Sequence, residues 1–390
     1  MREPLTFIDL FAGAGGFSLG LHRAGLKGIF AVERDGMAFS TLEYNLVRKA
    51  RAFEWPAWLP RSPMDIRALL DGYRDQLAKL SGKVDLVVGG PPCQGFSLAG
   101  RRTEHDERNQ MFREYLKFIE ITRPSMVMFE NVPGFAMPFK NGANPEKSYA
   151  SMLGDGLSAM GYGKPKFSVL NFSDHGVPQN RKRLIMVASS GGIDPARMMD
   201  LIRSSRKPRV TAREAISDLL RSHGEIPSQD SPRFMSGVYG SPASAYQREM
   251  RKGAYKETPD SHRFARHGAT VTERFTKVIG SYGGNGRRSN ARVASTGTRK
   301  RNQAVVDPEE PSPTLTTLPD DYVHYVEPRI LTVREYARLQ SFPDWFEFKG
   351  KYTTGGKLRA YETPRYTQVA NAVPPSFSFL LGSVVRLSSF

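Results

Sequence analysis

A single cysteine is the residue with the clearest capacity for covalent chemistry in this 390-residue chain. Cys93 stands in Gly-Gly-Pro-Pro-Cys-Gln-Gly-Phe-Ser, residues 89–97, directly after an apolar segment that predicts a buried strand. Open α/β sheets carry reactive groups just past the carboxyl ends of their strands, and a thiolate there is a strong nucleophile. A lone cysteine in a reducing compartment is more often buried and inert, but polar, turn-forming neighbours argue against an apolar surrounding. The pattern therefore favours a nucleophilic Cys93.

A glycine-rich segment near the N-terminus predicts a small-molecule site. Residues 7–21, FIDLFAGAGGFSLGL, predict a strand, a tight turn and the start of a helix. Gly13 and its neighbours allow the turn and a close approach of a ligand, while Glu33 ends the next predicted strand. A carboxylate about 20 residues after such a turn commonly binds ribose hydroxyls. Taken alone, this segment also fits a nicotinamide enzyme or a purely structural turn, although its spacing departs from G-x-G-x-x-G.

Short apolar segments alternate with helical patterns and would form the frame for these residues. This alternation predicts an α/β fold, a mostly parallel sheet with helices on both faces. The predicted strands are Leu5–Leu10, Ile29–Glu33, Val84–Gly89, Ser125–Glu130 and Leu184–Ala188, and the predicted helices are Phe17–Ala24, Met37–Lys49, Met111–Thr122, Leu331–Gln340 and Pro375 to about Leu387.

Charge is concentrated in the second half of the chain. The net charge is +17, and residues 195–305 hold 22 lysines and arginines against 9 acidic residues. Such an excess favours a polyanionic partner, of which nucleic acid is the commonest. Hydrophobic periodicity is weak from residue 190 to 328. We therefore expect a catalytic domain at 1–189, a basic domain at 190–328 and a C-terminal segment at 329–390 that returns to the first domain.

Several classes of protein are disfavoured by composition. One cysteine cannot form an intrachain disulfide, and the seven histidines show no metal-binding spacing, so we predict no metal. No apolar run approaches the ~20 residues that span a bilayer, and the N-terminus has no signal-peptide pattern. We expect a cytoplasmic protein that does not enter the membrane.

Pro91-Pro92-Cys93-Gln94 resembles the catalytic loop of the C5-cytosine DNA methyltransferase family. The resemblance extends along the chain, with Ala370 where the family's last block usually has glycine, and it leaves out only the basic region. The other blocks follow in the family's order: residues 7–21 resemble its S-adenosyl-L-methionine (SAM) block, Glu130–Val132 its Glu-Asn-Val block, Gln179–Arg183 its Gln-x-Arg-x-Arg block, Arg329–Pro343 its ninth block and Gln368–Pro374 its last block.

The resemblance implies a Rossmann-like SAM-dependent sheet, a smaller irregular target-recognition domain, and methyl transfer to C5 of a flipped cytosine in a specific duplex DNA sequence. The Cys93 thiolate would add to C6 and raise electron density at C5. Glu130 would stabilise charge at N3 as a proton or hydrogen-bond donor. Arg181 and Arg183 would contact the base and its phosphate, since they alternate along the predicted start of a strand and would share one face.

The resemblance also implies residues for the cofactor and for DNA. The SAM adenine would lie against Phe11 and Ile66, with its amino group on Asp65 and the ribose on Glu33, while the polar segment 98–112 would act as a lid over the DNA. The full cofactor set is Phe11, Ala12, Gly13, Gly15, Gly16, Glu33, Asp65, Ile66, Pro92 and Asn371. The DNA set is Gln94, Ser97, Arg101, Arg287, Arg288, Arg299, Lys300, Arg301 and Thr314.

Other classes share parts of this pattern. A cytosine methyltransferase acting on tRNA has the same catalytic blocks but needs less variable sequence than 190–328. A non-catalytic DNA-binding relative would not require Cys93, Glu130 and Arg183, and a nicotinamide enzyme leaves Pro-Pro-Cys-Gln unexplained. The expected partners are double-stranded DNA and, in a prokaryotic restriction-modification system, an endonuclease acting on the same site; we expect a monomer.

Overall fold

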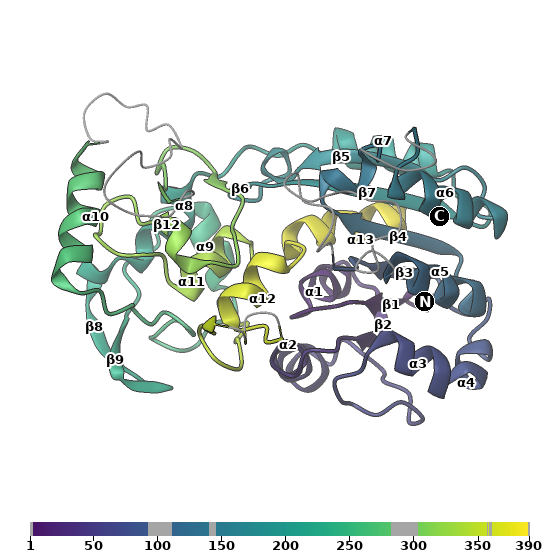
Figure 1. The fold of residues 1–390 in the computed structure, drawn as a ribbon, viewed down its shortest axis with the longest axis horizontal. Coiled ribbons are helices and arrows are strands. Elements are labelled where there is room, and N and C mark those ends of the chain that lie inside the picture. Colours follow the sequence, from purple (N-terminus) through teal and green to yellow (C-terminus); the bar gives the residue numbers. More distant parts are fainter. Residues whose placement is uncertain are drawn as a thin grey trace. The chain divides into compact units, whose positions relative to one another are not determined.

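A computed structural model describes residues 3–92, 111–139, 146–281, 303–356, 358 and 361–388. The chain divides into two compact units (Figure 1). Unit 1 comprises Met1–Asn171, Lys182–Arg206 and Pro375–Phe390, and unit 2 comprises Phe172–Arg181 and Lys207–Pro374. These bounds differ from the domain limits predicted at 189 and 328. Unit 1 extends to residue 206, unit 2 extends to residue 374, and Phe172–Arg181 belongs to unit 2. The roles of the domains stay predictions.

Unit 1 is built on a six-stranded sheet in the order β2-β1-β3-β4-β7-β5. β2, β1, β3 and β4 are parallel, whereas β7 runs antiparallel to both of its neighbours. The prediction of a parallel sheet thus holds for four strands, and the sheet as a whole is mixed. Every predicted strand is present; the bounds are β1 Thr6–Leu10, β2 Lys27–Val32, β3 Leu86–Gly89, β4 Met126–Asn131, β5 Lys166–Asn171 and β7 Lys182–Ser189.

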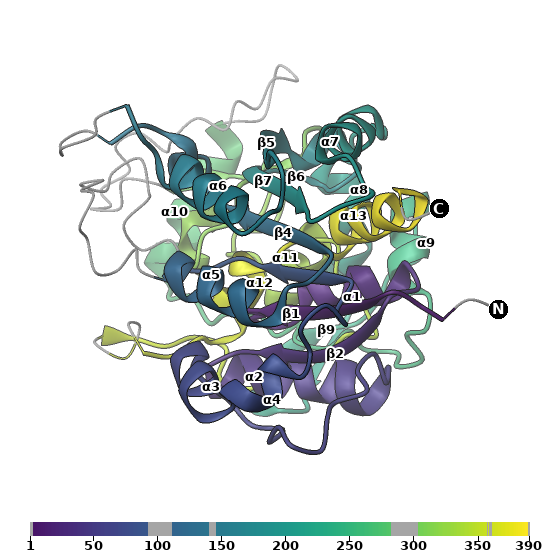
Figure 2. The same cartoon turned by 90° about the vertical axis from the view of Figure 1, so that its right-hand side faces the viewer.

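Helices pack on both faces of this sheet (Figure 2). One group is α1 Gly16–Arg23, α7 Pro195–Ser204 and α13 Pro375–Ser388. The other group is α3 Ile66–Gly72, α4 Arg74–Ala78, α5 Met111–Thr122 and α6 Tyr149–Ala159. α1 and α13 lie side by side although they come from opposite ends of the chain (Figure 1). Gly20 permits this contact, because a Cβ there would overlap the backbone of Pro375 and Phe379.

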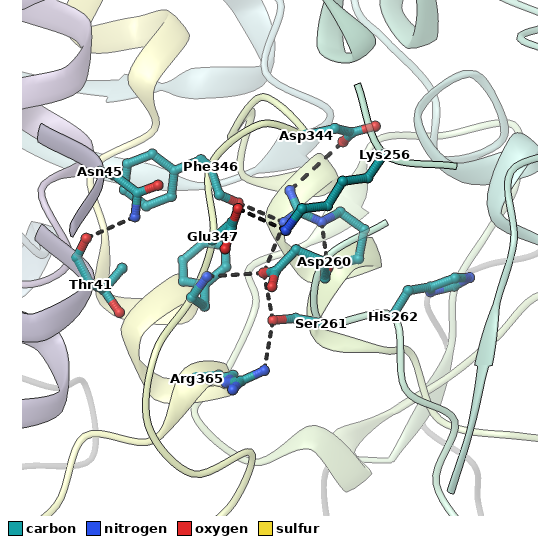
Figure 3. Close-up of polar contacts among 12 residues, drawn as sticks. Thr41, Asn45, Lys256, Asp260, Ser261, His262, Asp344, Phe346, Glu347 and Arg365 are labelled. Carbon is teal, nitrogen blue, oxygen red and sulfur yellow. Dashed lines mark hydrogen bonds and ion pairs between the residues drawn. The ribbon is translucent and has the colours of Figure 1, made fainter. Parts of the chain in front are cut away.

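The segment predicted as one amphipathic helix over Met37–Lys49 has two parts. α2 spans Gly36–Leu42 and continues as a π-helix over Glu43–Lys49. Within it, the buried side chain of Asn45 donates to the Thr41 carbonyl at 2.7 Å (Figure 3). π-helical turns often occur at functional sites. Here the π-helix presents Leu46 to the glycine turn after β1, where a Cβ on Gly15 would overlap it.

Unit 2 is made of many short elements. None of them was predicted before residue 331; all of these except the 13-residue α10 are segments of two to seven residues, which carry little periodicity. The strands are β6 Gln179–Asn180, β8 Glu225–Ser228, β9 Ser231–Gly237, β10 Ala304–Val305, β11 Ser312–Pro313 and β12 Tyr322–Val323. The helices are α8 Ala212–Ile216, α9 Ala245–Arg251, α10 Ala269–Ser281, α11 Val333–Leu339 and α12 Arg365–Asn371.

Buried ion pairs hold unit 2 together. Arg338 on α11 has no exposed side-chain surface, and its Nε lies 2.5 Å from Asp344 Oδ1 while Nη1 lies 3.2 Å from Asp218 Oδ1. Arg329 is likewise paired with the buried carboxylate of Glu335 at 2.7 Å. Burying a charge is unfavourable unless partners replace its water, so these groups depend on one another.

Asp260 links three further segments of the same unit. It accepts from Ser261 Oγ at 2.7 Å, and Ser261 Oγ in turn accepts from Arg365 at 3.0 Å (Figure 3). Arg334 donates to the Asp260 carboxylate at 3.2 Å and to the Phe346 carbonyl at 2.6 Å. This network ties the segment before α10 to α11 and α12.

Two further observations concern classes of site. None of the helices that the structure describes is both long and apolar enough to span a bilayer. In the described ranges, His, Cys, Asp and Glu side chains do not gather in threes in a way that could hold a metal ion.

Candidate active site

The carboxyl ends of β1, β3 and β4 meet at one edge of the unit 1 sheet. The register pairs Leu10 with Gly89 and Gly89 with Phe129, so β1 and β3 end level with Phe129, two residues before the end of β4. The next residues, Phe11, Gly90 and Glu130, therefore lie along this edge. The sequence predicts such strands well, because runs that are buried on both faces are continuously apolar.

Glycine at position 90 makes room for Glu130. A Cβ on Gly90 would lie 2.9 Å from Glu130 Oε2. The Glu130 side chain is only 10% exposed. Gly89 is required for a different reason, because a Cβ there would lie 2.6 Å from the Tyr115 ring. The paired glycines thus bring the segment that leads to Cys93 directly against the Glu130 carboxyl group.

Asn131 fixes the same segment from β4. Its Nδ2 donates to the Pro91 carbonyl at 3.1 Å, and its Oδ1 accepts from the Val132 amide at 2.9 Å. The residue is buried. Cys93 itself lies outside the described residues, as do the predicted DNA contacts Gln94, Ser97 and Arg101. No role for Asn131 is predicted from the sequence, although its place in Glu-Asn-Val is a signal that could have indicated one.

Arg183 forms an ion pair with Glu130. Arg183 Nε lies 3.1 Å from Glu130 Oε1, and the two side chains are 13% and 10% exposed. The antiparallel direction of β7 explains the pair: Asn131 is in register with Leu184, so β7 begins at the edge where β4 ends. A parallel β7 would have put Arg183 at the opposite edge of the sheet.

The structure contradicts the prediction that Arg181 and Arg183 share one strand face. β6 ends at Asn180 and β7 begins at Lys182, so Arg181 falls in the break between two strands. Its amide donates to the Gln179 carbonyl at 2.9 Å, a local turn that ends the alternation. Arg181 belongs to unit 2, where its guanidinium donates to the Ala372 carbonyl at 3.4 Å, whereas Arg183 belongs to unit 1.

The glycine turn after β1 is joined to Glu33. The backbone there has positive φ at Phe11 (60°), Gly13 (57°) and Gly15 (87°). Glu33 Oε2 accepts from the Gly13 amide at 2.9 Å, and Oε1 accepts from the Asp35 amide at 2.7 Å. Burial raises the pKa of Glu33, and these two backbone donors oppose that rise. The turn and the carboxyl group are therefore held as one structure.

The space at this turn fits a nucleoside-bearing cofactor. A Cβ on Gly13 would meet nothing within 4 Å, so the turn borders open space rather than packed protein. Phe11 and Glu33 are both half-buried at its rim, offering a ring face and carboxylate oxygens. Ala12 is buried and donates its amide to Val32 at 2.9 Å, and Gly16 begins α1. These groups suit SAM, whose adenosine needs an apolar surface and a ribose acceptor.

The other predicted cofactor residues occupy different settings. The Met64 amide donates to the Glu33 carbonyl at 2.8 Å, which brings Asp65 next to the end of β2. Asp65 caps α3 by accepting from the Arg67 amide at 2.9 Å, and Ile66 is only 2% exposed. Pro92 follows β3 and is exposed, while the exposed Asn371 ends α12 in unit 2. Their roles toward a cofactor remain predictions.

Glutamine side chains connect three of the sequence blocks within unit 2. Gln179 donates to Gln340, which is fully buried and donates to the Ala372 carbonyl. Gln179 Oε1 accepts from the Leu315 amide at 3.1 Å. Thr314 Oγ1 donates to the Asn180 carbonyl at 2.7 Å. The remaining predicted DNA contacts lie outside the described residues: Arg287, Arg288, Arg299, Lys300 and Arg301.

Solved structures of methyltransferases share this fold. One is a prophage-encoded protein of E. coli described as a DNA modification methyltransferase; it is 24% identical, 99% of each chain is covered, and the TM-score is 0.67. Another is the methyltransferase EhMeth of Entamoeba histolytica, which is 12% identical with a TM-score of 0.58 and full coverage of both chains. The α/β unit and its glycine turn therefore define a methyltransferase fold.

The sequence comparisons give the family. The model of the C-5 cytosine-specific DNA methylases matches residues 5–385. The Type II methyltransferase M.DdeI of Desulfomicrobium norvegicum is 32% identical over 95% of this chain and 86% of its own length. M.XorII of Xanthomonas oryzae pv. oryzae is 28% identical over 99% of this chain and 85% of its own. The chain therefore belongs to the C-5 cytosine-specific DNA methylases and is a DNA (cytosine-5-)-methyltransferase.

Proposed function

We propose that this enzyme methylates C5 of a flipped cytosine within a specific duplex DNA sequence, through a covalent adduct between Cys93 and C6. The observation that carries the proposal is the position of Glu130 against Gly90, three residues before Cys93. That contact puts a carboxyl group beside the segment that ends in the nucleophile. Asn131, bonded to the Pro91 carbonyl, fixes the same segment.

The chain's residues would act on the cytosine ring in sequence. The Cys93 sulfur forms a bond to C6, the C5–C6 double bond opens, and its electron pair is delocalised toward N3 and C5. Glu130 donates a proton or hydrogen bond at N3 and stabilises this charge, while Arg183 contacts O2. C5 would then form a bond to the methyl group that bound SAM supplies, and the bond between that methyl group and the sulfonium sulfur would break to leave a neutral thioether. A base removes the C5 proton, and the C6–sulfur bond breaks to release the thiolate and restore the ring.

Residues of the carboxyl edge would hold the cofactor. SAM, when bound, supplies an electrophilic methyl group. Glu33 accepts hydrogen bonds from the ribose and Phe11 packs on the adenine, with the open side of Gly13 facing the bound molecule. Asp65 and Ile66 complete the adenine site, and Pro92 and Asn371 close the methionine end in this proposal. No step requires a metal ion.

We assign target recognition to the basic region. Residues 190–328 would bind the duplex, with Arg287, Arg288, Arg299, Lys300, Arg301 and Thr314 facing DNA, whereas Arg181 would contact the flipped base or its phosphate. M.DdeI and M.XorII are Type II methyltransferases. By analogy, this monomeric enzyme would act in the cytoplasm of a prokaryotic cell, paired with an endonuclease that cleaves the same site.

Trapping of the covalent adduct tests the proposal. A duplex with 5-fluorocytosine at the target should form a complex with the wild-type enzyme and SAM, because fluorine blocks the final elimination. The chain has one cysteine, so mass spectrometry of the adduct identifies Cys93 without ambiguity. Cys93→Ser should lose trapping and turnover but still bind SAM and DNA. Turnover of the variant above about 1% of wild type would contradict the assignment.

Two controls separate the alternative classes. Bisulfite sequencing of DNA treated with the enzyme reports the modified base and its sequence. Equal amounts of duplex DNA and tRNA, each with labelled methyl donor, distinguish the two nucleic acids. Preferential methylation of tRNA would replace the DNA proposal, and binding without any methylation would favour a non-catalytic DNA-binding protein.

A further inference from the structure

Unit 2 contains a hollow of about 390 Å³ with an uneven balance of charge. Arg263, Arg266 and His267 line it together with the rings of Phe234 and Tyr352. Among the described residues that line it, Asp320 is the one carboxylate. The hollow lies just before α10 in the sequence and was not singled out from the sequence, which directed attention to residues 282–302.

Arg263 is held in one orientation by aromatic rings. Its guanidinium carbon lies 3.6 Å from the Tyr352 ring centroid and 4.2 Å from that of Phe234. Nη1 donates to Ser231 Oγ at 3.0 Å. The side chain is half-buried, and this burial lowers the pKa of Arg263 below its usual value. Stacking on rings orients the planar fork of donors without neutralising its charge.

Arg266 stands beside it on the exposed side. Its guanidinium carbon lies 5.1 Å from the Phe234 centroid, and Nη2 donates to the Arg233 carbonyl. Among the residues that the structure describes, neither Arg263 nor Arg266 forms an ion pair with a carboxylate. Arg365, by contrast, does form an ion pair, since its Nη1 lies 2.6 Å from Asp230 Oδ2. Arg263 and Arg266 thus differ from Arg329, Arg334, Arg338 and Arg365, which are buried in the same unit and paired with carboxylates.

His267 adds a neutral donor. Its Nε2 accepts from the Ile330 amide at 3.3 Å, so the ring proton of the neutral form resides on Nδ1. Burial lowers the pKa of His267, which favours this neutral form. Two guanidinium groups and one N–H donor outweigh the single carboxylate of Asp320. The hollow therefore suits an oxyanion with several acceptor oxygens.

We propose that this hollow binds a phosphodiester of the DNA backbone, with Arg263 and Arg266 as its phosphate contacts. The assignment rests on the proposed function, which makes duplex DNA the substrate. An arginine fork donates two parallel hydrogen bonds to phosphate, and a stacked guanidinium has already lost much of its rotational freedom. Contacts of this kind fix the register of a protein on the duplex without reading sequence.

Salt dependence of DNA binding provides the main test. Arg266→Gln removes the exposed cation, and Arg248→Gln is its matched control, since Arg248 is exposed on α9 and does not line the hollow. Arg266→Gln should weaken binding equally for target and unrelated duplexes. The slope of log K against log salt should fall by about 0.9, the value for one lost phosphate contact. Arg248→Gln should match the wild type.

Methylphosphonate substitution identifies the phosphate itself. Each backbone position of the target duplex is neutralised in turn, and binding is measured with wild type and with Arg266→Gln. At one position, the methylphosphonate should lower the affinity of the wild type. The same substitution should leave the affinity of Arg266→Gln unchanged, because that variant already lacks the contact. The proposal would be overturned if each methylphosphonate lowered the affinity of Arg266→Gln as much as that of the wild type. It would also be overturned if Arg266→Gln and Arg248→Gln had the same slope of log K against log salt.

Turnover separates this inference from the proposed function. Arg266→Gln should raise KM for DNA and leave kcat at saturating DNA unchanged. If the wild type does not methylate cytosine in duplex DNA, the proposed function fails. If the wild type does so and Arg266→Gln has an unchanged KM, only the phosphate site is wrong.

Discussion

Acidification should destabilise unit 2 through one buried imidazole. His262 is fully buried, with Nδ1 2.8 Å from Thr332 Oγ1 and Nε2 2.9 Å from the Leu219 carbonyl. Thr332 Oγ1 accepts from the Glu335 amide at 3.2 Å, so its hydroxyl hydrogen points to Nδ1. The neutral ring thus satisfies both nitrogens, and a second ring proton would meet a donor. Burial lowers the pKa of His262 from 6.5 to about 4.

This shift sets the sign and size of the effect. Between pH 6.5 and 4 the unfolded chain binds the proton that the folded chain excludes, so stability falls as pH falls through this range. At 1.36 kcal/mol for each pKa unit, the whole loss is about 3 kcal/mol, of which about 2 kcal/mol falls between pH 7 and pH 5. Asp9 acts in the opposite direction, because burial raises its pKa to about 7 and its protonation adds stability on acidification.

The comparison of wild type with His262→Gln isolates the histidine, since Asp9 contributes equally to both. Urea unfolding at pH 7 and pH 5 should give a wild-type loss about 2 kcal/mol larger than that of the variant. Thr332→Val is the control; it should lower the free energy of unfolding at both pH values yet keep most of the wild-type pH dependence, because the burial that mainly lowers the pKa of His262 remains. Equal pH dependence in wild type and His262→Gln would refute the reasoning, as would an NMR titration of His262 near its usual pKa.

Three further changes probe the candidate site and the buried charges. Glu130→Gln should lower turnover by about 10²–10⁴, the usual range of general acid catalysis, and leave SAM affinity unchanged by calorimetry; loss of SAM binding would instead assign Glu130 to the cofactor. Asn131→Ala should slow 5-fluorocytosine trapping through the released Pro91 carbonyl and cost about 1–3 kcal/mol of stability in urea unfolding; a trapping rate equal to that of the wild type would remove its positioning role. Arg338→Met should destabilise the protein by about 3–5 kcal/mol, because Asp344 and Asp218 would lose their buried partner; a change below about 1 kcal/mol would mean that water or another cation replaces the arginine.

The strands that the sequence predicts are buried along most of their length. β3 and β4 are buried throughout, so their apolar runs stand out between turn residues. β5 was missed because it is an edge strand whose residues Phe167 and Val169 are 44% and 45% exposed. The direction of β7 could not be read locally, since antiparallel and parallel strands of this length have similar sequences. That direction determines the contact between Arg183 and Glu130.

In unit 2 the core is hard to predict from the sequence, because some of its buried residues are charged. Arg334 and Arg338 resemble surface residues in a sequence, yet both are fully buried and their charges are paired. The error at Arg181 has a related origin, because a two-residue strand and a local turn interrupt an alternation that appears regular. By contrast, the glycine turn and Glu33 were foreseen as neighbours, since a turn after β1 and the end of β2 must meet at one edge.

The packing of α13 on α1 has a consequence for how the polypeptide is made. α13 belongs to unit 1 but is translated only after all of segment 207–374. At about 5–20 residues per second, the ribosome needs about 10–30 s to cross that segment. During this time the groove around Gly20 lacks its helix, so the nascent unit 1 exposes apolar surface to chaperones and proteases. A circular permutant that begins at Pro375 and is joined to β1 through a linker would deliver unit 1 first and shorten that exposure.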